Sequence, residues 1–179
     1  MRKALLVLVI CLLASPVWAG GAFSLFGTWT QTTEESEAIG AGVRLSYGSD
    51  HLKGDLTWTW LPVANDVDTT LGYDDDLQII PTDLGVRYII NQEGSVSFYF
   101  GGGITYFWAN LSNGWISDEW GAHGMGGFNF GKGRAQLFVE GTYRWADGQV
   151  SFTQDPNTTI RGDLTYGGLG VNVGVFWRW

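Results

Sequence analysis

The sequence predicts an all-β fold, an eight-stranded antiparallel up-and-down transmembrane β-barrel that follows a signal peptide. Three observations support this prediction. A short apolar run stands near the start of the chain, and the rest divides into alternating segments of about ten residues. The chain is also rich in aromatic residues, with 10 Trp, 10 Phe and 7 Tyr, and its charges fall on one face of the alternating segments.

Residues 1–19 have the pattern of a secretory signal peptide. Arg2 and Lys3 precede an apolar run at 4–14, which is shorter than the roughly 20 residues that a membrane-spanning helix needs. We expect cleavage after Ala19 and a mature barrel of residues 20–179. The single cysteine, Cys11, lies within the signal, so no disulfide scaffold or thiolate metal site is expected in the barrel.

Composition narrows the possible functions. A net charge of -8 and a pI near 4.5 argue against binding to nucleic acid, which depends on clustered Lys and Arg. The mean hydropathy is +0.01, and no long apolar run follows the signal, which excludes helical membrane spans. The remaining length suits a single domain.

The alternating segments define the expected strands and loops. Strands are expected at 22–31, 39–48, 51–61, 79–90, 95–108, 119–130, 134–146 and 163–179. Tight turns at 48–50, 91–94 and 131–133 alternate with longer loops at 32–38, 62–78, 110–118 and 147–162. This alternation of short and long connections is typical of a transmembrane barrel with both termini in the periplasm.

Side-chain parity predicts which face of each strand meets lipid. In the last strand Val171, Val173 and Val175 share one face, while Asn172 and Arg178 share the other. In five strands every charge lies opposite the apolar face. A soluble barrel would place the bulky apolar faces inside, but an eight-stranded lumen is too narrow for them. We therefore expect charges inside and aromatics outside.

Two sets of side chains follow from this parity. Aromatic girdles are expected at the two membrane interfaces, formed by Trp29, Trp60, Trp108 and Trp145 on one side and by Tyr47, Tyr88, Phe128, Phe130, Trp177 and Trp179 on the other. A polar network is expected in the lumen, formed by Arg44, Lys53, Asp55, Asp83, Arg87, His123, Glu140, Arg144, Asn172 and Arg178. The network is interpreted either as a stabilising plug or as a narrow conduction path, because inward glycines leave space for water or ligand.

The C-terminal segment and one hairpin resemble known proteins. Asn172, Gly174, Trp177 and Trp179 match the assembly signal of bacterial outer-membrane proteins. The stretch 85–88 and the aromatic and glycine run 98–104 resemble the small outer-membrane β-barrel domain family, which includes OmpA- and OmpX-like barrels. The resemblance implies a Gram-negative outer membrane, contact with its lipids and lipopolysaccharide, and recognition by the barrel-assembly machinery. It implies fold and location more than activity.

The remaining chemistry is sparse. Only His51 and His123 are available for acid-base work, no motif places a serine beside either, and the His-x-Ser-Asn-type motif of lipid A deacylases is absent. The expected loops are acidic, most densely at 74–76, but lack the spacing of an EF-hand, so we expect no specific metal site and no cofactor. The sequence favours a monomeric, non-enzymatic barrel with a structural or surface-interaction role. A porin-like narrow channel or small-ligand carrier is the alternative, and a lipid-modifying enzyme is less favoured.

Overall fold

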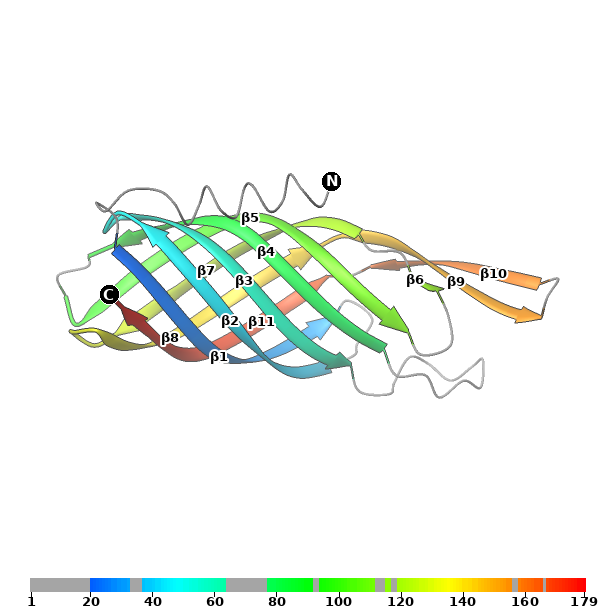
Figure 1. The fold of residues 1–179 in the computed structure, drawn as a ribbon, viewed down its shortest axis with the longest axis horizontal. Helices are drawn as coiled ribbons and strands as arrows, with labels where there is room; N and C mark the ends of the chain where they lie inside the picture. The colour runs from blue at the N-terminus through cyan, green and yellow to red at the C-terminus, as the bar shows by residue number, and fades with distance from the viewer. Residues whose placement is uncertain are drawn as a thin grey trace.

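Eight strands of the chain form a closed β-barrel, and three shorter strands form a small sheet beyond it (Figure 1). The structure is a computed structural model that describes residues 20–32, 37–63, 77–91, 94–111, 115–116, 119–155, 158–165 and 167–179. The expected signal peptide, 1–19, lies outside these residues. Within them, no helix is long and apolar enough to cross a membrane.

The barrel has the up-and-down topology predicted from the sequence. Its strands are β1 (Gly20–Thr32), β2 (Glu37–Gly48), β3 (Leu52–Val63), β4 (Leu77–Ile90), β5 (Val96–Leu111), β7 (Glu119–Phe130), β8 (Ala135–Trp145) and β11 (Gly168–Arg178). Each strand is antiparallel to both neighbours, and β1 closes the ring by pairing with β2 and β11. The predicted all-β, eight-stranded barrel is therefore confirmed.

The two ends of the barrel differ in their connections. The short turns at 49–51 and 131–134 lie, together with the last residues of β4, at the end where β1 begins and the C-terminus is found (Figure 1). Gly131 and Gly133 have φ values of 118° and 139°, and Asn91 has 56°, which are conformations that glycine and asparagine tolerate best. We call this end the turn end and the opposite end the loop end.

The small sheet corrects part of the sequence prediction. Its strands are β6 (Trp115–Ile116), β9 (Asp147–Asp155) and β10 (Thr158–Thr165), in the order β10-β9-β6. The β9–β10 hairpin projects past the loop end of the barrel (Figure 1). The expected loop at 147–162 is thus largely strand, and residues 163–165 belong to this hairpin instead of the last barrel strand. An alternating pattern is the same in both settings, so it did not separate them.

Two prolines interrupt the hydrogen-bonded wall near the loop end. Between β3 and β4 the pairs run to Trp58 with Thr82 and resume at Leu61 with Ile79, so two register positions around Pro81 are skipped. Between β2 and β3 two positions around Pro62 are skipped in the same way. Proline has no N–H, and one missing donor removes both the pair it belongs to and the adjacent pair that depends on the same bond.

The interior of the barrel is mixed in character. Ala22, Phe26, Phe138 and Phe176 form a buried hydrophobic cluster in the half nearer the turn end. Gly42 and Gly174 make room for these rings, because a Cβ on either glycine would meet the ring of Phe26 or Phe138. The rest of the lumen is filled mainly by polar and charged side chains.

Candidate functional site in the barrel lumen

The candidate site is the polar interior of the barrel, which strand alternation builds from every wall strand. In β8 exposed and buried residues alternate strictly, so Phe138, Glu140, Thr142 and Arg144 all point inward. Nine of the ten residues expected in the lumen are at most 6% exposed, and Arg178 is partly exposed. The charges thus lie on the inner face and most of the large apolar side chains on the outer one.

Glu140 is the centre of the largest cluster. Arg44 binds its carboxylate in a bidentate manner, with Nη1 2.8 Å from Oε2 and Nη2 2.5 Å from Oε1. Tyr99 donates its hydroxyl to Oε2 at 3.0 Å, and Asn172 donates its side-chain amide to Oε1 at 2.8 Å. Glu140 therefore accepts four hydrogen bonds from three side chains on β2, β5 and β11, and it is fully buried on β8.

The register explains how these residues meet. Tyr99, Gly127, Glu140 and Asn172 form one row across β5, β7, β8 and β11. Gly127 has no side chain, so the Tyr99 ring lies over it and its hydroxyl reaches Glu140. This is a close approach that any larger residue at position 127 would block.

Contacts along the Arg44 side chain hold it in the orientation in which it binds Glu140. Its Nε donates to Thr57 Oγ1 at 3.1 Å, and its guanidinium lies 5.7 Å from the ring centroids of both Phe26 and Phe138. A planar guanidinium between two aromatic rings gains cation–π attraction and loses little rotamer freedom. Arg44 thus lies across the lumen, from β2 to β8.

A second cluster lies around Asp83. Arg144 donates Nη2 to Oδ2 at 2.7 Å and Nε to both carboxylate oxygens at 3.2 Å. Thr105 donates its hydroxyl to Oδ1 at 2.7 Å, and His123 Nδ1 lies 3.0 Å from the same hydroxyl. His123 Nε2 has no hydrogen-bond partner in the described part of the protein. This arrangement joins β4 to β8 across the two strands between them.

A third cluster lies nearer the turn end. Arg87 donates Nη2 to Asp55 Oδ1 at 3.1 Å and to Ser46 Oγ at 3.0 Å, and its Nε lies 3.0 Å from Asp55 Oδ2. Its guanidinium also lies 4.8 Å from the centroid of the Tyr99 ring, which connects this cluster to that of Glu140. Three buried Arg–carboxylate pairs therefore follow one another along the lumen.

Two predicted cations have weaker partners. Lys53 Nζ donates to the backbone carbonyl of Gly20 at 3.3 Å. Arg178 donates Nη2 to the amide oxygen of Gln136 at 3.3 Å, and its guanidinium lies 5.2 Å from the Phe176 ring centroid. Neither forms an ion pair within 4.0 Å with a described carboxylate.

Several network members were not in the predicted set. Ser46, Thr57, Thr105 and Gln136 hydrogen-bond to the predicted charges and are all buried. Ser46, Thr57 and Gln136 share the inward parity of a predicted network residue on the same strand, so parity was sufficient to find them, whereas Thr105 lies on β5, where no network residue was predicted. Apart from Asn172, the prediction selected titratable residues and passed over neutral hydroxyls and amides.

The outer surface is a continuous apolar belt. Exposed aromatics form close groups, for example Tyr106 with Trp108 at 4.7 Å and with Trp120 at 4.8 Å between ring centroids. Phe98 and Phe128 form a similar pair at 5.4 Å nearer the turn end. Of the ten expected girdle residues Trp60, Tyr88, Trp108, Phe128, Phe130, Trp145, Trp177 and Trp179 are well exposed, whereas Trp29 and Tyr47 are partly covered.

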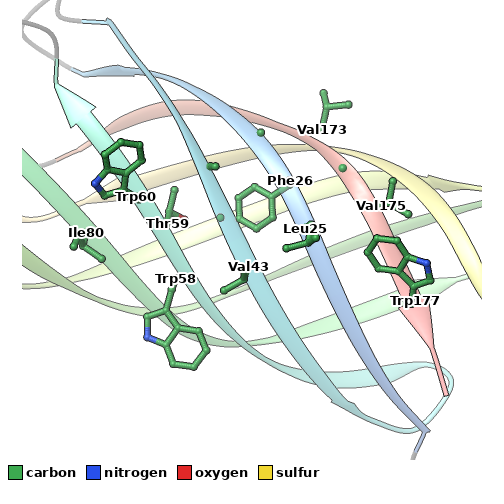
Figure 2. A pocket seen from close by; sticks show the side chains of 14 residues that line it. Leu25, Phe26, Val43, Trp58, Thr59, Trp60, Ile80, Val173, Val175 and Trp177 are labelled. Atoms are coloured by element: carbon green, nitrogen blue, oxygen red, sulfur yellow. The ribbon is translucent and has the colours of Figure 1, made fainter.

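The outer wall also contains an apolar groove of about 690 Å³ across β11, β1, β2 and β3 (Figure 2). Small residues, Gly27 and Ala41, leave it open, and Trp58, Trp60 and Trp177 stand at its sides. The groove lies on the same face as the rest of the apolar belt.

Few of the expected acidic loop residues can be placed. Glu34, Glu35, Asp66, Asp68, Asp74, Asp75, Asp76 and Asp118 lie outside the described residues. Glu37 accepts a hydrogen bond from Trp29 Nε1 at 3.3 Å. Within the described ranges, no three His, Cys, Asp or Glu side chains are grouped as a metal site.

Comparisons with known proteins identify the fold. No protein-family model matches the chain, and no curated protein sequence matches it. Among solved structures it is similar to the outer membrane protein OprG from Pseudomonas aeruginosa, with 15% identity, a TM-score of 0.69 and coverage of 90% of this chain and 95% of that one.

Two further structures extend this similarity. Neisserial surface protein A has 12% identity, a TM-score of 0.66 and coverage of 90% of this chain and 97% of its own. The outer membrane protein AlkL has 13% identity, a TM-score of 0.62 and coverage of 90% and 89%. At these identities the similarity shows the fold. With its closed antiparallel ring, charged interior and apolar outer belt, the chain has the fold of the small eight-stranded outer-membrane β-barrels.

Proposed function

We propose that the chain is a non-enzymatic integral barrel of the bacterial outer membrane, with a lumen closed by a polar plug and with a structural or surface-interaction role. The Arg44–Glu140 pair is the observation that carries this proposal. It crosses the lumen from β2 to β8 and is held by Tyr99, Thr57 and Asn172. An eight-stranded barrel has an interior just wide enough for side chains to fill, which favours a plug.

The outer face supports the membrane location. Val173, Val86 and Leu137 are 55–58% exposed, and a water-facing surface with so many large apolar side chains would promote aggregation. In a bilayer the same side chains contact acyl chains, and the exposed Trp and Tyr residues lie at the interfaces. The partners that fit this surface are outer-membrane lipids and lipopolysaccharide, and we propose a monomer.

The assembly signal remains a proposal that competes with packing. Asn172 donates to Glu140, and a Cβ at Gly174 would meet the Leu25 carbonyl, Phe26 and Phe138. Contacts within the folded barrel thus explain why these two residues stand at their positions, in addition to recognition by the barrel-assembly machinery. Trp177 and Trp179 are exposed, although Trp177 stacks against Phe23 and the ring of Trp179 lies over Gly21. Because neither takes part in the lumen network, they are the better test of recognition.

The surface-interaction role is supported by the projecting hairpin. β9 and β10 extend the backbone beyond the loop end, where a partner outside the cell would reach it (Figure 1). Glu37 and Asp147 contribute exposed carboxylates at the same end. The chemistry of this end therefore suits a cationic partner more than an anionic one.

Planar-bilayer recording of the refolded protein tests the plug. We expect no single-channel steps from the parent protein, because the three Arg–carboxylate pairs occupy the lumen. Reproducible steps from the parent at neutral pH would contradict a closed lumen. The exposed substitution Glu37→Gln is the control for sample handling, since it removes one carboxylate without touching the lumen.

A narrow water-filled channel is the second candidate. Four buried threonine hydroxyls, of Thr28, Thr30, Thr59 and Thr142, have no hydrogen-bond partner among the described residues. Buried hydroxyls usually find a partner, and water is the partner that a lumen can supply. Steps in the recording would favour this candidate.

A lipid-modifying enzyme is the least supported alternative. His123 is buried and lies beside Thr105, Asp83 and Arg144, all of which are already engaged in the lumen network. A lipid bound at the outer surface would not reach it. Mass spectrometry of phospholipid and lipid A incubated with the purified protein would reveal activity, and a modified product would refute the non-enzymatic role.

A further inference from the structure

The charges in the lumen do not balance, and the excess lies at one end. The inward charged residues described are five cations, Arg44, Lys53, Arg87, Arg144 and Arg178, and four carboxylates, Asp55, Asp83 and Glu140 together with Glu119 at the loop end of β7. Asp55, Asp83 and Glu140 each form an ion pair with one arginine. Lys53 and Arg178 are left without a carboxylate within 4.0 Å.

These two cations converge on the first residues of β1, at the turn end. Lys53, Gly48 and Gly20 form one row across β3, β2 and β1, and Lys53 reaches the Gly20 carbonyl across the glycine between them. Arg178 pairs in register with Ala22, two residues further along β1 and on the same face as Gly20. Both side chains therefore approach the same mouth of the lumen from opposite sides of β1.

The groups that Lys53 and Arg178 contact in the structure do not neutralise their charges. Lys53 is 6% exposed and has one neutral carbonyl as its hydrogen-bond acceptor. Arg178 has one amide oxygen, and its buried Nε has no acceptor among the described residues. Lys53 is repelled by Arg87 and Arg178, and an unpaired buried charge is costly.

Asp50 is the nearby acidic side chain that has to be considered. It lies in the exposed turn between β2 and β3 and attracts both Lys53 and Arg178. It forms no ion pair within 4.0 Å with either, so the attraction acts over a longer distance and is screened by solvent. The C-terminal carboxylate of Trp179, whose backbone oxygen lies beside Gly20, likewise forms no ion pair within 4.0 Å with either cation. In direct contact, Lys53 and Arg178 therefore have neutral acceptors only.

We propose that Lys53 and Arg178 form a binding site for a small oxyanion, such as inorganic phosphate, at the turn-end mouth of the lumen. Both side chains offer only N–H donors, which excludes a metal ion and favours an acceptor-only ligand. Both lie on the inner face, whereas phospholipid headgroups meet the outer face, so the ligand is a free anion that enters through the mouth. Arg178 is partly exposed and keeps the site open to solution.

The test is an NMR titration of the refolded chain in an uncharged detergent with inorganic phosphate, against chloride at equal ionic strength. We expect saturable shifts of the amide signals of Gly21, Lys53 and Arg178 with phosphate only. Lys53→Gln and Arg178→Gln each remove one charged donor and should weaken the apparent affinity about tenfold or more.

Lys132→Gln is the matched control. Lys132 lies in the exposed turn at 131–134, at the same end of the barrel, and the substitution removes the same charge away from the lumen. Its phosphate affinity should stay within about twofold of the parent, as expected for an exposed charge in salt. An equal loss in Lys132→Gln and Lys53→Gln would show general charge attraction and overturn the site.

Other outcomes are also decisive. Equal shifts with phosphate and chloride, or shifts that do not saturate, would overturn an oxyanion site. A response to anionic phospholipid added to the micelles, with none to phosphate, would assign the two cations to the membrane surface. If Lys53→Gln fails to refold, Lys53→Arg should retain binding and Arg178→Gln should still lose it.

Discussion

Removing the charge of Glu140 is the most direct perturbation of the lumen. Glu140→Gln keeps the shape of the side chain but replaces one acceptor oxygen with an amide donor. Glu140 accepts four hydrogen bonds, two of them from Arg44, and both residues are buried. The substitution therefore leaves a guanidinium in the lumen without a counter-charge. We expect the free energy of unfolding to fall by about 3–5 kcal/mol, the usual cost of breaking one partner out of a buried ion pair.

The double variant Arg44→Met, Glu140→Leu separates ion pairing from packing. Replacing both charges with apolar side chains leaves no unpaired charge and is often close to neutral. Tyr99 and Asn172 would still lose an acceptor, at about 1 kcal/mol each. The double variant should therefore be more stable than Glu140→Gln, and the effects of the two sites should be strongly non-additive.

Equilibrium unfolding in urea, followed by tryptophan fluorescence of the barrel in lipid vesicles, measures these differences. Glu37→Gln is the matched control, because it makes the same chemical change at an exposed site and should cost less than about 1 kcal/mol. Two results would refute the reasoning. One is a Glu140→Gln variant within about 1 kcal/mol of the parent, and the other is strict additivity of single substitutions at positions 44 and 140.

Three further predictions use the same unfolding assay. Gly174→Ala should destabilise by about 1–3 kcal/mol, because its methyl group would meet Phe26 and Phe138, whereas Gly27→Ala, whose methyl group meets nothing within 4 Å, should be near neutral. Equal effects of the two would contradict the packing described for the lumen. Val173→Arg should cost about 2–4 kcal/mol if this exposed position meets the middle of the bilayer, and a cost near zero would mean that it meets water. Pro81→Val should restore a donor toward Thr59 on β3 and stabilise by about 0.5–1.5 kcal/mol, with slower hydrogen exchange at Thr59; unchanged exchange there would show that the gap has another cause.

The fold could be predicted from the sequence because every wall strand of a membrane barrel obeys the same constraint. Every wall strand must alternate between lipid and lumen, so parity alone separated Val173 from Asn172 and Val139 from Glu140. The same alternation explains why the hairpin of β9 and β10 could not be predicted. Its residues also alternate, and no local signal marks where a strand leaves the bilayer.

Parity could not predict which inward residues pair with one another in the lumen. Arg44 could have paired with Asp55, Asp83 or Glu140, since all lie on the inward face. The choice of Glu140, 96 residues away, depends on how the strands are staggered around the ring. Register and tilt decide which inward residues share a level, and the sequence of a single strand carries neither. Glycines were the clue that could have narrowed the choice, because Gly127 is what lets Tyr99 and Glu140 meet.

The same staggering explains why the charge excess lies at one end. Asp55, Asp83 and Glu140 each form an ion pair with an arginine along the lumen. The two cations without a paired carboxylate, Lys53 and Arg178, lie where β1 begins. A plug built only for stability would be expected to finish with a carboxylate there, since unpaired buried charge is unfavourable. Lys53 instead extends past Gly48 to the backbone carbonyl of Gly20. We therefore propose two roles for one barrel, closure of the lumen by Glu140 and its partners and anion binding at the turn end.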